Sequence, residues 1–87
     1  MTLASVLVTG GGSGSGAALA RELAARGCSV IVSGRRSHAL DVVASSSPLV
    51  STCPGDVTDP AHRAALVESL GSVPGPRAIV HAAGFFQ

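Results

Sequence analysis

Eight residues near the N-terminus, TGGGSGSG at positions 9–16, have the composition of a turn that binds phosphate. An apolar run at 4–8 precedes this turn, and an alanine-rich helical pattern follows it. Because glycines lack a Cβ, backbone N–H groups in such a turn face an anion at the positive end of the helix. The segment therefore predicts a site for a phosphate-bearing nucleotide. A flexible Gly/Ser linker is the alternative, but Val6, Leu7 and Val8 just before the turn favour burial.

The length and composition indicate one small α/β domain that occupies residues 1–87. Hydrophobic residues make up 46% of the chain and charged residues only 13%, against about 25% charged in an average chain. Such a low charge content is typical of a parallel sheet that helices cover on both faces.

Several kinds of function are excluded by what the sequence contains. The net charge of +1 and the scattered arginines give no field for nucleic acid or an anionic membrane. No apolar stretch reaches the roughly 18 residues of a membrane span, and the N-terminus does not resemble a signal peptide. Cys28 and Cys53 show no metal or redox spacing, so we expect buried thiols in a reducing cytoplasm. Because lysine is absent, the turn is not that of a P-loop nucleoside triphosphatase.

The hydrophobic periodicity alternates between strand and helix along the chain. It predicts strands at 3–9, 29–33, 49–53 and 77–81, and helices at 15–26 and 37–44. A third helix begins at Asp59-Pro60, which suit its N-cap and first turn, and closes at Gly71. Leu66 and its neighbours Val67 and Leu70 are predicted to form its apolar stripe. Repeated βα units with short links imply right-handed crossovers and a parallel sheet.

The glycines fit two known nucleotide-binding registers. Gly12, Gly14 and Ala17 match the dinucleotide pattern G-x-G-x-x-[GA], whereas Gly10, Gly14 and Gly16 match T-G-x-x-x-G-x-G. In the first pattern the leading glycine directly follows the strand, but Gly12 lies four residues past Val8. Gly10 lies close against the strand, so the second register fits better.

The second register, with Thr9 leading it, resembles the short-chain dehydrogenase/reductase family. Segments after the other three predicted strands agree with that resemblance: 34–36 (GRR), 55–59 (GDVTD) and 81–84 (HAAG). In the family these places bind the adenosine ribose, the adenine and the sugar near the nicotinamide. The resemblance implies a Rossmann-like three-layer fold (β-α-β-α-β-α-β) and covers only the first half of a family member. The cofactor-binding residues predicted from it are Gly10, Gly12, Ser13, Gly14, Ser15, Gly16, Arg35, Arg36, Asp56, Val57, His81, Ala82, Ala83 and Gly84.

Arg35 and Arg36 bear on the choice of coenzyme. A carboxylate at the end of the second strand would bind a ribose diol and favour NAD, but Gly34 stands there. An arginine beside it has two N–H donors for a 2′-phosphate, which favours NADP over NAD. The alternative is a solvated arginine pair.

The resemblance also assigns roles to the residues after the third strand and in the turn. Asp56 would accept a hydrogen bond from the adenine amino group, with Val57 alongside the ring. An Asx turn before the next helix is the alternative for Asp56. Ser13 and Ser15 would bind phosphate through hydroxyl and backbone groups.

The sequence contains three histidines, and only His81 lies where the family resemblance suggests a role. His81 and Ala82 stand where the family more often has asparagines. His81 is therefore either a cofactor neighbour, a general base or, as we favour, a side chain that bonds to local backbone. His38 and His62 are expected at exposed helix starts.

The family's reaction is hydride transfer between a nicotinamide and a carbonyl or alcohol, and it uses a Y-x-x-x-K segment. This chain contains neither tyrosine nor lysine, so we expect it to be inactive alone, because the developing alkoxide needs a tuned proton donor. A non-catalytic nucleotide-binding or assembly module is the alternative. A methyltransferase is less favoured. Such an enzyme has an acidic residue that binds the ribose after the second strand, where this chain has GRR at 34–36. The bare edge of the strand at 77–81 predicts self-association or a complementary C-terminal half.

Overall fold

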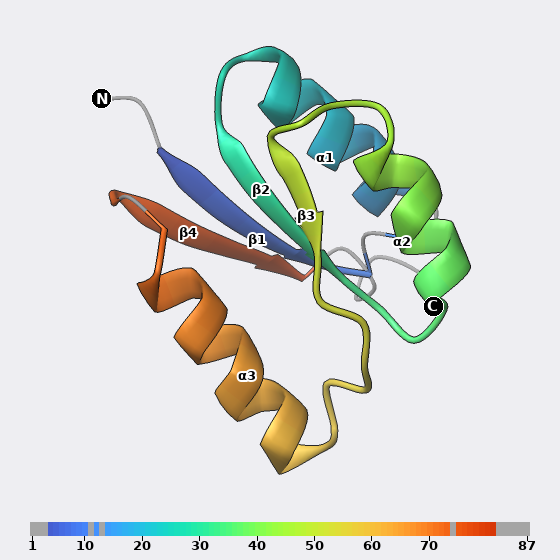
Figure 1. Ribbon diagram of the computed structural model, residues 1–87, viewed down its shortest axis with the longest axis vertical. Coiled ribbons are helices and arrows are strands. Elements are labelled where there is room, and N and C mark those ends of the chain that lie inside the picture. Colours follow the sequence, from blue (N-terminus) through green and yellow to red (C-terminus); the bar gives the residue numbers. More distant parts are fainter. Residues whose placement is uncertain (1–3, 11, 13, 74, 82–87) are drawn as a thin grey trace.

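The computed structural model describes residues 4–10, 12, 14–73 and 75–81, which form four strands and three helices in strict alternation (Figure 1). The elements are β1 (Ser5–Thr9), α1 (Gly14–Ala25), β2 (Ser29–Ser33), α2 (Ser37–Ala44), β3 (Val50–Thr52), α3 (Pro60–Gly71) and β4 (Arg77–His81). Every predicted element is present, and its ends differ from the prediction by no more than two residues.

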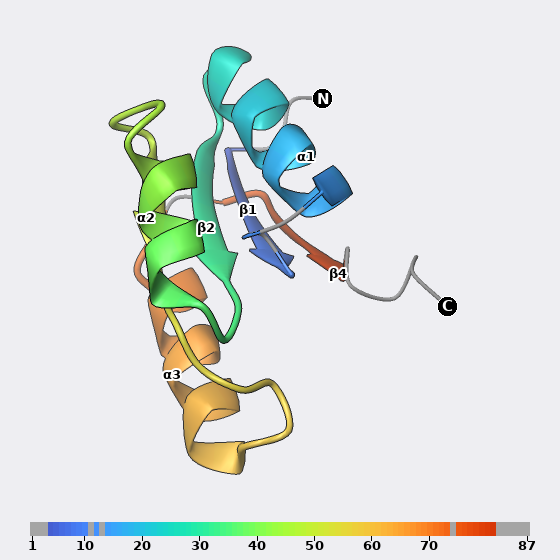
Figure 2. The ribbon, with the colours of Figure 1, turned by 90° about the vertical axis from the view of Figure 1, so that its right-hand side faces the viewer.

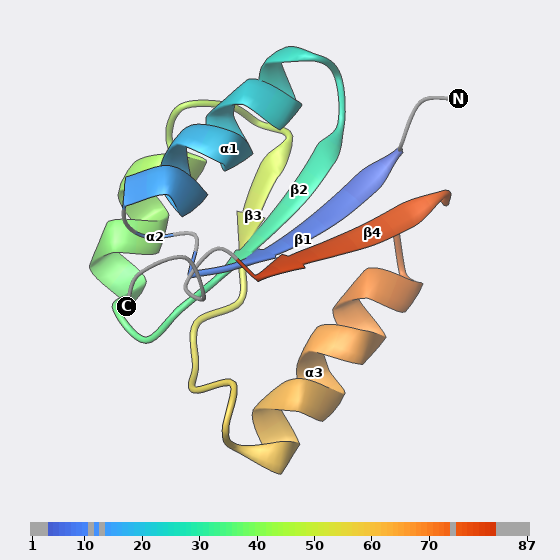
Figure 3. The same ribbon diagram turned by 180° about the vertical axis from the view of Figure 1, so that it is seen from behind.

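The strands form one parallel sheet in the order β3-β2-β1-β4, which Figure 3 shows from left to right. Ser5 of β1 aligns with Ser29 of β2 and with Arg77 of β4, and Val30 of β2 aligns with Val50 of β3. Because all four strands run the same way, their carboxyl ends meet at one edge of the sheet. The predicted Rossmann-like α/β fold is confirmed.

The core has two layers, one on each face of the sheet, because successive strand residues point to opposite faces. Val6, Val8, Val30 and Val32 pack with α1 and α2, which lie in front of the strands in Figure 2. The intervening Leu7 and Ile31 pack with Leu66 of α3 on the other face. The residues of α1 that meet the sheet are small: Gly16, Ala17, Ala20 and Ala24. The helix therefore lies close to the strands that end beside the glycine turn.

The face that α3 buries differs from the prediction. Its buried residues are His62 and Leu66, with Leu70 partly buried, whereas Val67 is 71% exposed. The spacing 62, 66, 70 is a stripe at i, i+4, i+8 on one side of a helix. The expectations that Val67 is buried and that His62 is exposed were therefore wrong.

β4 forms one edge of the described sheet, and its exposure alternates between exposed and half-buried residues. Ile79 at its centre is 51% exposed. A largely apolar pocket of about 600 Å³ lies between this strand, β1 and α3, where Leu7, Leu66, Leu70 and Ile79 contribute to its lining. This side of the sheet is therefore less covered than the side beneath α1 and α2.

Candidate nucleotide-binding site

The glycine turn joins the end of β1 to the start of α1. Gly10 follows β1 directly, has a φ of 74°, and donates its N–H to the Ser33 carbonyl at 2.8 Å. Gly14 begins α1 with a φ of 49°. Both conformations favour glycine, because they bring a Cβ too close to the backbone. The turn is thus held against β2 by a backbone hydrogen bond.

The first turn of α1 has the properties of an anion site. Gly14 and Ser15 are exposed, Gly16 is buried, and no acidic residue lies in this turn. The first N–H groups of a helix have no partner within it and lie at its positive end. These groups can therefore donate to a phosphate. Ser13 lies outside the described residues.

Gly12 lets the turn approach α2 closely. A Cβ at this position would lie 3.2 Å from Ala39 Cβ and 3.4 Å from Leu40 Cδ2. Leu40 is fully buried, so it cannot move aside without disturbing the core. A larger residue at Gly12 would displace the turn from its support on α2.

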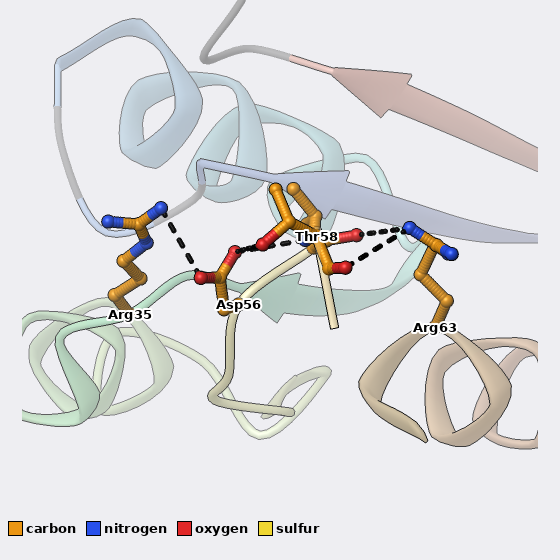
Figure 4. Close-up of polar contacts among 5 residues, drawn as sticks. Arg35, Asp56, Thr58 and Arg63 are labelled. Carbon is orange, nitrogen blue, oxygen red and sulfur yellow. Dashed lines mark hydrogen bonds and ion pairs between the residues drawn. The ribbon is translucent and has the colours of Figure 1, made fainter. Parts of the chain in front are cut away.

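The residues after β2 and β3 lie side by side at the same edge of the sheet. The Gly55 N–H donates to the Gly34 carbonyl at 2.8 Å, which joins the two loops. Beyond that bond, Arg35 Nη2 lies 3.4 Å from Asp56 Oδ2 (Figure 4). Arg36 occupies the N-cap position of α2 with an extended backbone. The structure thus brings together Arg35 and Asp56, two residues singled out for separate parts of a nucleotide.

Asp56 forms the Asx turn that the sequence offered as its alternative role. Its Oδ1 accepts the Thr58 N–H at 2.9 Å and the Thr58 hydroxyl at 2.8 Å. These bonds, the backbone one most strongly, hold the pKa of Asp56 below its ordinary 3.8, and the Arg35 charge adds to the effect. The side chain remains 40% exposed. Asp56 is therefore an oriented, accessible carboxylate beside Arg35.

A second arginine holds the same loop from the side of α3. Arg63 Nη1 donates to the Val57 carbonyl at 3.2 Å and to the Thr58 carbonyl at 3.5 Å (Figure 4). Val57 itself is 43% exposed. Arg63 could not be singled out from the sequence, because its contacts depend on how α3 is placed beside the loop.

His81 is held by a neighbouring strand. Its Nδ1 and the Thr9 hydroxyl are 2.9 Å apart, so the two form a hydrogen bond between the ends of β4 and β1. The expected partner was local backbone, but the partner present is a side chain one strand away. Ala82, Ala83 and Gly84 lie outside the described residues.

His62 is the residue of this region that the sequence analysis missed. It is only 9% exposed, and its Nε2 lies 2.9 Å from the hydroxyl of the buried Ser33 at the end of β2. The available signal was its position one turn before Leu66 and two turns before Leu70. That spacing places a histidine on the buried face of α3.

Within the described residues, no group of three or more His, Cys, Asp or Glu side chains is arranged to hold a metal ion. Cys28 is buried and Cys53 half-buried. No helix in that part of the chain is long and apolar enough to cross a membrane. The polar groups described at this edge are backbone amides, arginines, a carboxylate, hydroxyls and the histidines His62 and His81.

A sequence model of the short chain dehydrogenases matches residues 4–85. The chain belongs to the short-chain dehydrogenase family. No curated protein sequence matches it, but members of the family with solved structures do.

One similar structure is a short-chain dehydrogenase from Sphingobium yanoikuyae in complex with NADPH. It is 33% identical, with a TM-score of 0.67 over 78% of this chain and 29% of that chain. A 3-ketoacyl-(acyl-carrier-protein) reductase from Brucella melitensis complexed with NADH is 29% identical, with a TM-score of 0.71 over 75% and 27% of the two chains. Serine dehydrogenase from Escherichia coli is 34% identical, with a TM-score of 0.63 over 80% and 32%. The chain thus spans about a third of the length of these short-chain dehydrogenases.

Proposed function

We propose that this chain is the NADP(H)-binding portion of a short-chain dehydrogenase/reductase. The observation that carries the proposal is the meeting of Arg35 and Asp56, 3.4 Å apart, at the sheet edge where the glycine turn also lies. Ligands of open parallel sheets bind outside the carboxyl ends of the strands. The similar structures with bound coenzymes support a dinucleotide as the ligand.

The glycine turn would hold the pyrophosphate of the coenzyme. The N–H groups at the start of α1 would donate to its oxygens, and the hydroxyls of Ser13 and Ser15 would add further bonds. Two features of the turn fit this role. The backbone has positive φ angles at Gly10 and Gly14, and Gly12 packs closely against α2. The residues proposed here are Gly10, Gly12, Ser13, Gly14, Ser15 and Gly16.

The two loops beside the turn would hold the adenosine. The Arg35 side chain is 74% exposed and uses one nitrogen towards Asp56, so its other donors are available for a 2′-phosphate. Arg36 would add positive charge, Asp56 would accept from the adenine amino group, and Val57 would lie along the ring. We therefore propose NADP in preference to NAD. Similar structures contain NADPH, NADP+ or NADH, so this preference rests on Arg35.

The nicotinamide end would lie along His81, Ala82, Ala83 and Gly84. The coenzyme, when bound, would supply the hydride for a carbonyl or accept it from an alcohol in a longer family member. The chain contains no tyrosine or lysine to donate the proton, so we propose that it does not turn over a substrate by itself. Carbonyl reduction with NADPH by the purified 87-residue protein would contradict this part.

The exposed edge of β4 favours a second candidate role, that of a non-catalytic nucleotide-binding or assembly module. Unpaired strand edges with apolar side chains associate with other strands. Ile79 and the apolar pocket beside it are such a surface. In this second role a further copy of the chain would cover the surface, whereas in a longer family member a complementary C-terminal half would cover it. We propose a cytoplasmic location for either role, because a reducing environment suits the buried Cys28. A dimer seen by size-exclusion chromatography with light scattering would indicate self-association.

The coenzyme assignment is tested by calorimetric titration of the wild-type protein and of Arg35→Ala with NADPH and NADH. Hydrogen bonds to charged groups contribute about 1.5–3 kcal/mol, so NADPH affinity should fall roughly tenfold or more while NADH affinity is unchanged. Arg21→Ala removes an exposed arginine from α1 and should change neither. Equal losses for both coenzymes in Arg35→Ala would refute the preference.

A further inference from the structure

A buried histidine lies directly beneath the proposed adenosine site. The His62 ring comes from α3, and its Nε2 bonds to the hydroxyl of Ser33, a fully buried residue, at 2.9 Å. Its other side lies against Gly55, where an added Cβ would be only 2.4 Å from the ring Nδ1. We call Ser33, Gly55 and His62 the histidine contact. It joins the end of β2, the loop after β3 and the first turn of α3.

The histidine contact lies one or two residues from both groups that would bind adenosine. Ser33 precedes Arg35 by two residues, and Gly55 directly precedes Asp56. The hydrogen bond from Gly55 N–H to the Gly34 carbonyl, 2.8 Å long, crosses the same gap. The His62 ring therefore contacts a residue on each side of the hydrogen bond that joins the two loops.

The exposed ion pair above this contact cannot by itself fix that separation. Arg35 and Asp56 are 3.4 Å apart, with side chains 74% and 40% exposed, and such solvated pairs contribute little because water screens them. A buried hydrogen bond is costly to break, because its polar groups lose their partners. The buried histidine contact is thus a stronger constraint than the ion pair, and it acts beside the backbone hydrogen bond from Gly55 to Gly34.

We propose that His62 is a positioning residue for coenzyme selection: it sets the spacing of the two loops so that Arg35 and Asp56 together receive a 2′-phosphorylated adenosine. This inference rests on the proposed function, and it adds a residue that does not touch the ligand. His62 acts through the loops on either side of it.

The test compares two probes that differ only in the 2′-phosphate, adenosine 2′,5′-bisphosphate and adenosine 5′-monophosphate. Their affinities are measured by calorimetry on the 87-residue protein and on His62→Leu, His62→Gln and Ser33→Ala. In His62→Leu the ratio of the two affinities should fall roughly fivefold to tenfold, as one hydrogen bond to a charged group is weakened. His62→Gln should retain part of the ratio, because its amide still bonds to the Ser33 hydroxyl.

Leu66→Ala is the matched control, because it loosens the same buried face of α3 one turn further on. It should lower stability and leave the ratio unchanged. An equal fall in the ratio for Leu66→Ala and His62→Leu would overturn the inference, because general loosening would then explain both.

The remaining outcomes separate the inference from the proposed function. If the wild type prefers the bisphosphate and all three variants at Ser33 and His62 keep that preference, the inference is wrong and the proposed function stands. If the wild type binds neither probe, the proposed function fails and the inference fails with it. Should His62→Leu not fold, an unchanged ratio in Ser33→Ala and His62→Gln would overturn the inference.

Discussion

Replacing Gly55 by alanine should destabilise the protein by forcing His62 from its buried place. The new Cβ would lie 2.4 Å from His62 Nδ1 and 2.6 Å from two ring carbons, so the ring must move. Its departure leaves the buried Ser33 hydroxyl without that hydrogen bond, which costs about 1–3 kcal/mol. The φ of 156° at Gly55 adds strain for any residue with a Cβ.

Together these effects should lower the free energy of unfolding by at least about 2 kcal/mol. That is a large share of the roughly 4–13 kcal/mol typical of a chain this long. Urea denaturation followed by circular dichroism measures the change. At a typical slope of about 1–2 kcal/mol per M, the midpoint should fall by roughly 1–2 M.

Gly71→Ala is the matched control for this prediction. Gly71 ends α3, and nothing lies within 4 Å of where its Cβ would be. Alanine favours the helix over glycine by up to about 1 kcal/mol, so this variant should be as stable as the wild type or slightly more so. If Gly55→Ala unfolds at the same urea concentration as Gly71→Ala, the close contact between Gly55 and His62 is not a constraint.

Three further predictions concern stability, each checked by urea denaturation. Leu40→Ala removes a fully buried side chain and should lower the free energy of unfolding by about 2–5 kcal/mol. Val67→Ala, at a position that is 71% exposed, should change that free energy by less than about 0.5 kcal/mol. Asp59→Ala removes the N-cap of α3 and should cost about 1 kcal/mol; no loss would show that the cap is dispensable. The bonds from Thr58 lower the pKa of Asp56, so its stabilising effect is present above pH 3.8 and is lost as the pH falls through the lowered pKa. Wild type and Asp56→Asn should therefore differ at pH 7 and converge in acid.

The alternation of elements could be predicted because each signal is local. The strands that helices cover on both faces appear as short apolar runs, and α3 begins at an aspartate followed by proline. The glycine turn could be placed for the same reason, since it follows one apolar run and precedes one helix. The order of strands and helices and the position of the glycine turn thus depend only on residues that are close in the sequence.

The contacts at the proposed adenosine site could not be predicted in this way. Arg35 and Asp56 are 21 residues apart, and they meet only because β2 and β3 end at the same edge. The burial of His62 depends on which side of α3 turns to the sheet. The predicted apolar stripe consisted of Leu66, Val67 and Leu70, and a helix in that orientation would expose His62 to solvent. The helix was predicted correctly, but the side of it that faces the sheet was not: His62 is buried there and Val67 is exposed.

The parallel direction of the strands also determines where a label can be attached far from the proposed nucleotide site. The links that enter the strands, at 26–28 before β2 and at 45–49 before β3, lie at the end of the sheet opposite the glycine turn. A fluorophore or surface anchor attached at residues 45–49 would lie about the length of a strand away from a nucleotide bound at the proposed site. Immobilised in that orientation, the molecule presents the rim that carries the proposed nucleotide site to solution.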